Sequence, residues 1–233
     1  MNQLQRTLTG LRTIADSKRA FHAAFPYVIP SLYRRTADEL LVELHLLSHQ
    51  TQFKTNALFA VGLRQVFTAF TKGYRPADHL PQLFDALCSC NGFNAEELKS
   101  LAEGSEQAVS GHSVDEVQTW LQAKGDGAPG PLATGLADIA GEQFHYSRLM
   151  AVGLFSLLSS AQGDSQDPEE LCKTAHTIGE QIGLSRPRLE KDLSLYRNNL
   201  EKMAQAVELM EETLASERRK RERQASENKQ PQD

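Results

Sequence analysis

The chain has 233 residues, of which 40% are hydrophobic, and a formal net charge of -5. This composition supports a sizeable core and excludes global disorder. The acidic balance argues against a general nucleic-acid-binding protein, whose affinity depends on many phosphate contacts. The longest nearly apolar run, residues 149–158, has about half the length needed to span a bilayer. We therefore expect a soluble or peripheral protein with a folded core.

Residues 16–35 read DSKRAFHAAFPYVIPSLYRR and combine basic, aromatic and proline residues. An RNA-binding strip is disfavoured because the glycine–aromatic pattern of the common RNA modules is missing. A membrane-surface helix is disfavoured because Pro26 and Pro30 interrupt any continuous apolar face. The stretch therefore predicts a short helix, an extended corner and a second helix, with its aromatic side chains in the core. Four basic residues are left facing outward as candidate partner-binding residues: Lys18, Arg19, Arg34 and Arg35.

Helix signals continue along the chain. Leucines at helical spacing predict a helix that opens at Ser31, and further helices are predicted behind N-terminal caps at Asn56, Asn94 and Ser113. Strand signals are nearly absent. The fold class is therefore predicted to be all-α, a single multi-helix domain followed by a long C-terminal helix.

The second half of the domain is predicted from one loop and two helices. Residues 123–131, rich in glycine and proline, form the clearest loop in the chain. A long apolar helix is predicted from about Leu132 to Ser160. Asp167 followed by Pro168 is a strong start signal for the next helix.

The last helix, from Ser185 onward, carries apolar residues at alternating intervals of four and three: Leu189, Leu193, Tyr196, Leu200, Met203, Val207, Met210 and Leu214. Such a stripe stays on one face only if the helix supercoils around a partner. The sequence leaves open whether this helix projects as a coiled-coil arm or folds back on its own domain. After Ala215 apolar residues almost disappear, which predicts a disordered tail. The expected organisation is a helical domain over residues 1–184, an amphipathic helix over 185–216 and a charged disordered tail over 217–233.

Metal-site patterns are incomplete. Glu142 and His145 form a single Glu-x-x-His pair, whereas a helical di-iron site needs two such pairs and two further carboxylates. His45 and His49 lie one helical turn apart, but no ligand set on a second helix accompanies them. We predict no metal site and no cofactor.

Catalytic patterns are also missing. The chain contains no phosphate-binding glycine loop and no nucleophile elbow. Asp38, Glu39 and Glu43 are interpreted as a solvated helix face, and Cys88 and Cys90 as buried small residues at a helix end. Together with Cys172 these are only three cysteines, too few and odd in number for a disulfide framework, which indicates a reducing compartment. No catalytic residue is predicted, and the chain is expected not to be an enzyme.

Two long motifs resemble one known family. They read TIADSKRAFHAAFPYVIPSLYRRTADELLVELHLLSHQTQFKTNALFAVGLRQVFTAFTKGYRP, from Thr13, and ADIAGEQFHYSRLMAVGLFSLL, from Ala137. These resemble the patterns of the thylakoid formation protein family, also called photosystem II biogenesis protein, subunit twenty-nine. The resemblance runs from about Thr13 to Asn199.

This resemblance implies an all-helical, non-enzymatic accessory protein of oxygenic phototrophs. It implies peripheral association with the cytoplasmic or stromal side of thylakoid membranes, alongside a soluble cytoplasmic pool. It also implies a role in photosystem II biogenesis and repair, by binding and stabilising FtsH protease complexes. Plant members begin with a transit peptide, which the start of this sequence does not resemble, so a cyanobacterial-type member or a processed form is expected.

The resulting hypothesis is a docking adaptor. The body binds FtsH through a surface that includes the exposed residues of the stretch 16–35, and the heptad-patterned helix lies along FtsH or a second protein. The alternative is a peripheral scaffold on the thylakoid lipid surface, held by basic patches, that recruits partners through its coiled-coil arm. Salt separates the two, because electrostatic lipid binding is screened.

Overall fold

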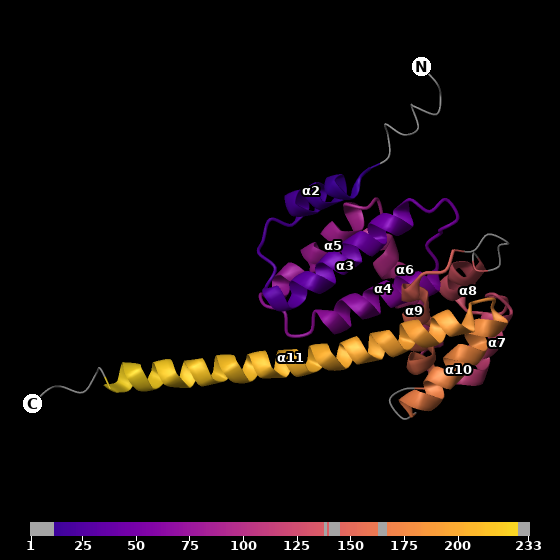
Figure 1. Cartoon of the computed structure of the whole chain (residues 1–233). Coiled ribbons are helices and arrows are strands. Elements are labelled where there is room, and N and C mark those ends of the chain that lie inside the picture. Colours follow the sequence, from indigo (N-terminus) through magenta and orange to yellow (C-terminus); the bar gives the residue numbers. More distant parts are fainter. Residues whose placement is uncertain (1–11, 138, 140–144, 163–166, 228–233) are drawn as a thin grey trace, which may run out of the picture.

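The computed structural model describes residues 12–137, 139, 145–162 and 167–227, and Figure 1 shows their arrangement. These ranges contain ten α-helices, one 3-10 helix and no strand, so the predicted all-α class is confirmed. The helices are α2 (Ile14–Ala24), α3 (Ser31–Ser48), α4 (Ala57–Phe70), η1 (Ala77–His79), α5 (Leu80–Ser89), α6 (Ala95–Val109), α7 (Val114–Gln122), α8 (Gly130–Ala137), α9 (Arg148–Gln162), α10 (Pro168–Gln181) and α11 (Arg186–Glu227).

Side-chain caps fix several helix starts where the sequence predicts them. The side-chain oxygens of Asn56, Asn94 and Asp167 accept hydrogen bonds from backbone N–H groups in the first turns of α4, α6 and α10. Ser113 and Glu116 form a reciprocal capping box at the start of α7. Each cap satisfies N–H groups that have no partner inside the helix, so local sequence sets these boundaries.

The opening stretch forms the predicted helix, corner and helix. Phe21 and Phe25 on and just after α2 are 4% and 1% exposed, as expected for core residues. The prediction that all the aromatics enter the core is wrong for Tyr27, which is 45% exposed and stacks on His79 with ring centroids 3.9 Å apart. Val28 is 82% exposed in the same corner. The link between α2 and α3 is extended and runs over the surface of the body. Because successive side chains of an extended segment point in opposite directions, some of them face the solvent.

The predicted single helix over 132–160 is wrong. Residues 145–147 are not helical, and α8 and α9 are separate elements on either side of an interval that is only partly described. Ser147 ends the break, because its hydroxyl accepts a hydrogen bond from the backbone N–H of Leu149 at 3.2 Å and donates to Glu43 of α3 at 3.3 Å.

Helix α4 lies at the centre of the body. All seven residues from 57 to 63 are buried, so other elements surround this part of the helix on every side. Its closest neighbour is α9, which it contacts at a pair of glycines. A Cβ atom on Gly62 would lie 1.7 Å from the Leu149 carbonyl oxygen, and one on Gly153 would lie 1.8 Å from that of Leu58. The two glycines therefore permit backbone contact between α4 and α9 that no other residue allows.

Helix α11 combines the two arrangements that the sequence left open. Its first half folds back on the body, where the apolar stripe is buried from Leu189 (0% exposed) to Val207 (9%), although Leu200 is only partly buried. Its second half projects beyond the body, as Figure 1 shows, and Leu209 and Leu214 are 66% and 41% exposed. The stripe loses its cover where the body ends.

The structure differs from the predicted tail boundary. Helix α11 continues to Glu227, through the first part of the segment 217–233 that the sequence predicted as disordered. Glutamate, lysine, arginine and alanine are good helix formers, and Arg221 lies 3.8 Å from Glu217 one turn earlier. Residues 228–233 lie outside the described residues, and disorder there stays a prediction.

Deleting residues 217–233 is expected to leave the melting temperature of the body unchanged to within about 1 °C. All described side chains from 211 to 224 are exposed, so their removal uncovers no core surface. Circular dichroism should report a smaller helical signal at the same midpoint. A clear fall in the midpoint would show that the arm contacts the body.

Over the residues that the structure describes, none of the helices combines the length and the apolar character needed to cross a bilayer.

Candidate functional site

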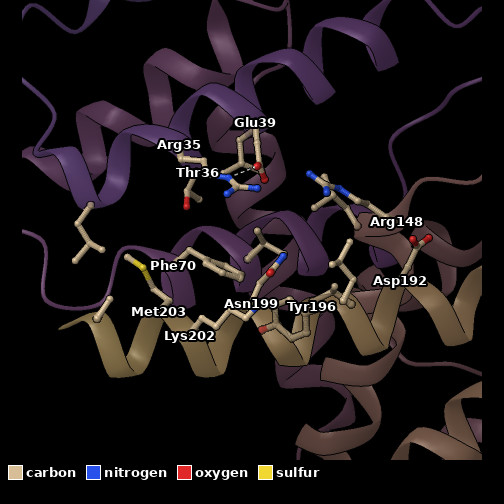
Figure 2. Close-up of a pocket in the computed structure, with 17 residues that line it drawn as sticks. Arg35, Thr36, Glu39, Phe70, Arg148, Asp192, Tyr196, Asn199, Lys202 and Met203 are labelled. Carbon is tan, nitrogen blue, oxygen red and sulfur yellow. Dashed lines mark hydrogen bonds and ion pairs between the residues drawn. The ribbon is translucent and has the colours of Figure 1, made fainter. Parts of the chain in front are cut away.

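A cavity of about 250 Å³ lies between α3, α4, α9 and α11 (Figure 2). It exists because the apolar stripe of α11 faces the body without filling the space against α3. Helical spacing directs apolar side chains of all four helices toward this space. They are Leu32, Leu40, Val66, Phe70, Leu149, Val152, Leu195, Tyr196, Met203 and Ala206.

Polar side chains line the remaining part of the cavity. Arg35 and Glu39 of α3 form an ion pair at 2.8 Å between Nε and Oε1. Figure 2 shows the guanidinium groups of Arg35 and Arg148 above the apolar lining, with Asn199 of α11 between them and the helix. Lys202 also lines the cavity from α11. The site thus combines an apolar interior with a polar edge rich in hydrogen-bond donors.

Arg148 is held in place by Glu43 of α3. Its Nε lies 2.7 Å from Glu43 Oε2, and the Glu43 side chain is only 15% exposed. Burial raises the pKa of Glu43 above its usual value, and the neighbouring guanidinium of Arg148 opposes that rise. The pair therefore joins the start of α9 to α3 through a largely buried carboxylate.

The segment before α9 is also tied to α11. The Tyr146 hydroxyl donates a hydrogen bond to Asp192 Oδ2 at 2.8 Å. Burial, and then the hydrogen bond to this carboxylate, raise the pKa of Tyr146. Residues 146–148 thus contact α3 on one side and α11 on the other, and so fix the width of the cavity.

The four candidate basic residues are all exposed, but the structure does not gather them into one site. Arg35 lines the cavity, whereas Lys18 and Arg19 lie on α2, which Figure 1 shows on the other side of α3 from α11. Arg19 pairs with Asp16 at 3.0 Å, and Arg34 donates to the Ile29 carbonyl oxygen at 3.4 Å. Their role in partner binding stays a prediction.

The histidines that the sequence singled out have structural contacts. His45 is 9% exposed, with its Nδ1 3.0 Å from the Ser17 hydroxyl, and His49 Nδ1 lies 2.8 Å from the His45 carbonyl oxygen. His145 packs edge-on against Phe53. Its predicted pair member Glu142 lies outside the described residues. Among the residues that are described, histidine, cysteine and carboxylate side chains form no group of three suited to a metal ion.

Cys88 and Cys90 lie buried at the end of α5, as the sequence indicated. Burial raises the pKa of Cys88 to about 12 and that of Cys90 to about 11. Since the thiolate is the reactive form, both thiols are unreactive at neutral pH.

Comparison of the sequence with known protein families shows the family to which the chain belongs. The family model for thylakoid formation protein matches residues 13–225. This chain belongs to the thylakoid formation protein family. The resemblance seen in the sequence motifs is confirmed, and the match covers the body and most of α11.

Other members of the thylakoid formation family are similar over nearly their whole length. Protein Thf1 of Prochlorococcus marinus strain MIT 9313 is 62% identical over 94% of this chain and 91% of its own. Protein Thf1 of Parasynechococcus marenigrum strain WH8102 is 54% identical over 92% of this chain and 94% of its own. The solved structure of Psb29 is 36% identical, covers 90% of this chain and 98% of its own, and superposes with a TM-score of 0.79. The helical architecture is therefore that of the thylakoid formation family.

Sequence reasoning missed most of the cavity in this thylakoid formation protein. Glu43 was interpreted as part of a solvated face, but it is largely buried and paired with Arg148. Asp192 was not singled out either. The available signal was the YSR triplet, Tyr146 to Arg148, which stands next to the apolar run of the second motif. Polar groups beside such a run need buried partners, and here the partners come from α3 and α11.

Proposed function

We propose that the protein is a non-enzymatic accessory factor in photosystem II biogenesis and repair that binds and stabilises thylakoid FtsH protease complexes. Membership of the thylakoid formation family implies the role in photosystem II biogenesis. That membership is the observation that carries the proposal. In this proposal the protein acts peripherally, on the cytoplasmic side of the thylakoid membrane, and also occurs free in the cytoplasm.

The form of α11 supports a docking role. Its second half projects from the body and exposes Leu209 and Leu214 among charged side chains (Figure 1). A helix of this kind offers apolar anchors to a partner surface, and Met210 and Leu214 of its stripe lie one helical turn apart. The exposed basic residues of α2 and α3 offer a second contact that electrostatics would steer toward acidic surfaces.

The test has two levels. Deletion of the gene is expected to lower FtsH abundance and slow photosystem II recovery after strong light. Unchanged FtsH and unchanged recovery would refute the proposed function. Affinity purification from solubilised thylakoids is expected to recover FtsH with the wild-type protein.

The same purification locates the interface. Changing Lys18, Arg19, Arg34 and Arg35 together to Glu is expected to weaken FtsH recovery. The matched control changes four exposed basic residues of α10 and α11 to Glu: Lys173, Arg188, Lys191 and Arg197. Undiminished recovery with the first variant, folded by circular dichroism, would assign those four residues a structural role only.

A further inference from the structure

The cavity between α3 and α11 is large enough for a ligand. Its volume is about 250 Å³. An apolar protein cavity of about 150 Å³ stays dry and binds benzene, and drug-sized ligand pockets begin near 300 Å³. A cavity of intermediate size therefore has room for one short hydrocarbon chain.

The polar edge has unused donors, and its positive side chains outnumber its negative ones: Arg35, Arg148 and Lys202 against Glu39 and Asp192. Arg35 and Arg148 each donate through Nε only, to Glu39 and Glu43, and their terminal NH2 groups have no hydrogen bond to any described residue. Of the two carboxylates that line the cavity, Glu39 accepts from Arg35, and Asp192 accepts from Tyr146. A guanidinium carries five N–H donors in a planar fork that matches a carboxylate or phosphate. The free guanidinium donors and the positive balance of this edge thus favour an anionic group.

The walls also distinguish an acyl chain from a peptide. All four walls are helices, whose backbone groups are bonded within the helix except in the first turns of α3 and α9, so they offer a peptide backbone few partners. A hydrocarbon chain has no hydrogen bonds to lose when it enters such a space.

We propose that this cavity binds an acyl chain with an acidic head group, which Arg35 and Arg148 hold at the edge. The chain lies against Leu40, Phe70 and Met203, and the head group accepts from the two guanidinium groups. This ligand is separate from the proposed partnership with FtsH. The chemistry is shared by a free fatty acid and by an anionic lipid that extends one chain from a bilayer.

The first experiment titrates the purified full chain with decanoate by isothermal calorimetry. Saturable binding of one decanoate per chain is expected, with decyltrimethylammonium not binding. Arg35→Gln is expected to weaken binding about tenfold, as for a lost charge-assisted hydrogen bond. Arg34→Gln is the matched control and should bind like the wild type, because Arg34 is exposed and does not line the cavity.

A second pair of variants tests the interior. Ala206→Phe fills the cavity from α11 and is expected to abolish binding, whereas Ala204→Phe, two residues earlier on an exposed position, should not. Thermal melts establish that each variant is folded. If Ala206→Phe does not fold, Arg35→Gln still tests the proposal, because it changes only an exposed side chain. No decanoate binding by the wild type, or equal binding by folded Ala206→Phe, overturns the proposal. So does binding of a peptide with an apolar C-terminal residue when decanoate does not bind.

Vesicle flotation identifies the source of the chain. Vesicles of phosphatidylcholine with phosphatidylglycerol are mixed with wild type, Ala206→Phe and Ala204→Phe. If decanoate binds and only Ala206→Phe loses flotation, the ligand is a bilayer lipid. If decanoate binds and flotation is absent or equal in all three, the ligand is a free fatty acid.

Discussion

Replacing Gly62 by alanine is expected to lower the free energy of unfolding by about 3 kcal/mol or more, which corresponds to a fall of about 6–12 °C in melting temperature. The added Cβ would lie 1.7 Å from the Leu149 carbonyl oxygen, so α4 and α9 must separate. Overpacking of this kind is severe because the obstacle is backbone and cannot change rotamer. Thermal and urea denaturation followed by circular dichroism measure the loss.

The matched control is Gly104→Ala in α6. A Cβ on Gly104 would lie 3.0 Å from Pro131 Cγ, a side chain on an adjacent helix that can shift by a few tenths of an ångström. The gain in helix propensity, about 1 kcal/mol, offsets that contact, so little change in stability is expected. A loss in Gly62→Ala no larger than that in Gly104→Ala would contradict the close approach of α4 and α9.

Arg148→Gln is expected to cost about 2 kcal/mol at pH 8, because it leaves the largely buried carboxylate of Glu43 without its cation. The figure lies below that for a fully buried pair because the Arg148 side chain is 41% exposed and water screens part of the attraction. Arg35→Gln, which breaks an exposed Arg–Glu pair, is the control and should not change stability measurably.

The cost of Arg148→Gln should depend on pH in a defined direction. Burial raises the pKa of Glu43 in the folded protein, so the folded state binds more protons than the unfolded state between the two pKa values, and stability falls as pH rises through that window. Removing Arg148 raises the folded pKa further and widens the window. The loss should therefore shrink as the pH falls toward the ordinary pKa of glutamate. Glu43→Gln combined with Arg148→Gln should restore stability at pH 8 and remove this pH dependence, and a loss independent of pH would contradict the explanation.

The sequence predicted the helix boundaries that depend only on residues close together in the chain. Asn56, Ser113 and Asp167 cap helices through hydrogen bonds to residues two or three positions later, so the sequence contains both partners side by side. Phe21 and Phe25 likewise follow from helical spacing beside two prolines.

The break before α9 could not be predicted in this way. It depends on Glu43, which lies 104 positions before Ser147, and on Asp192, which lies 46 positions after Tyr146. Within the apolar run alone, a continuous helix satisfies every local preference. The same reason explains why the cavity was missed, since its edge consists of residues from three distant segments.

The course of α11 was undecided for a different reason. A stripe with a 3.5-residue repeat looks the same whether its cover comes from the same chain or from another. The decisive quantity is how far the body extends along the helix, and in the structure that cover ends near Val207.

Because α11 is one unbroken helix, a small change in its tilt moves its far end over a larger distance. Residues 208–227 extend about 30 Å beyond the last buried stripe residue, at about 1.5 Å per residue. A tilt of about 10° around Val207 therefore displaces the far end by about 5 Å. The same unbroken helix forms one wall of the cavity, so the projecting segment and the residues that face Arg35 and Arg148 belong to one element.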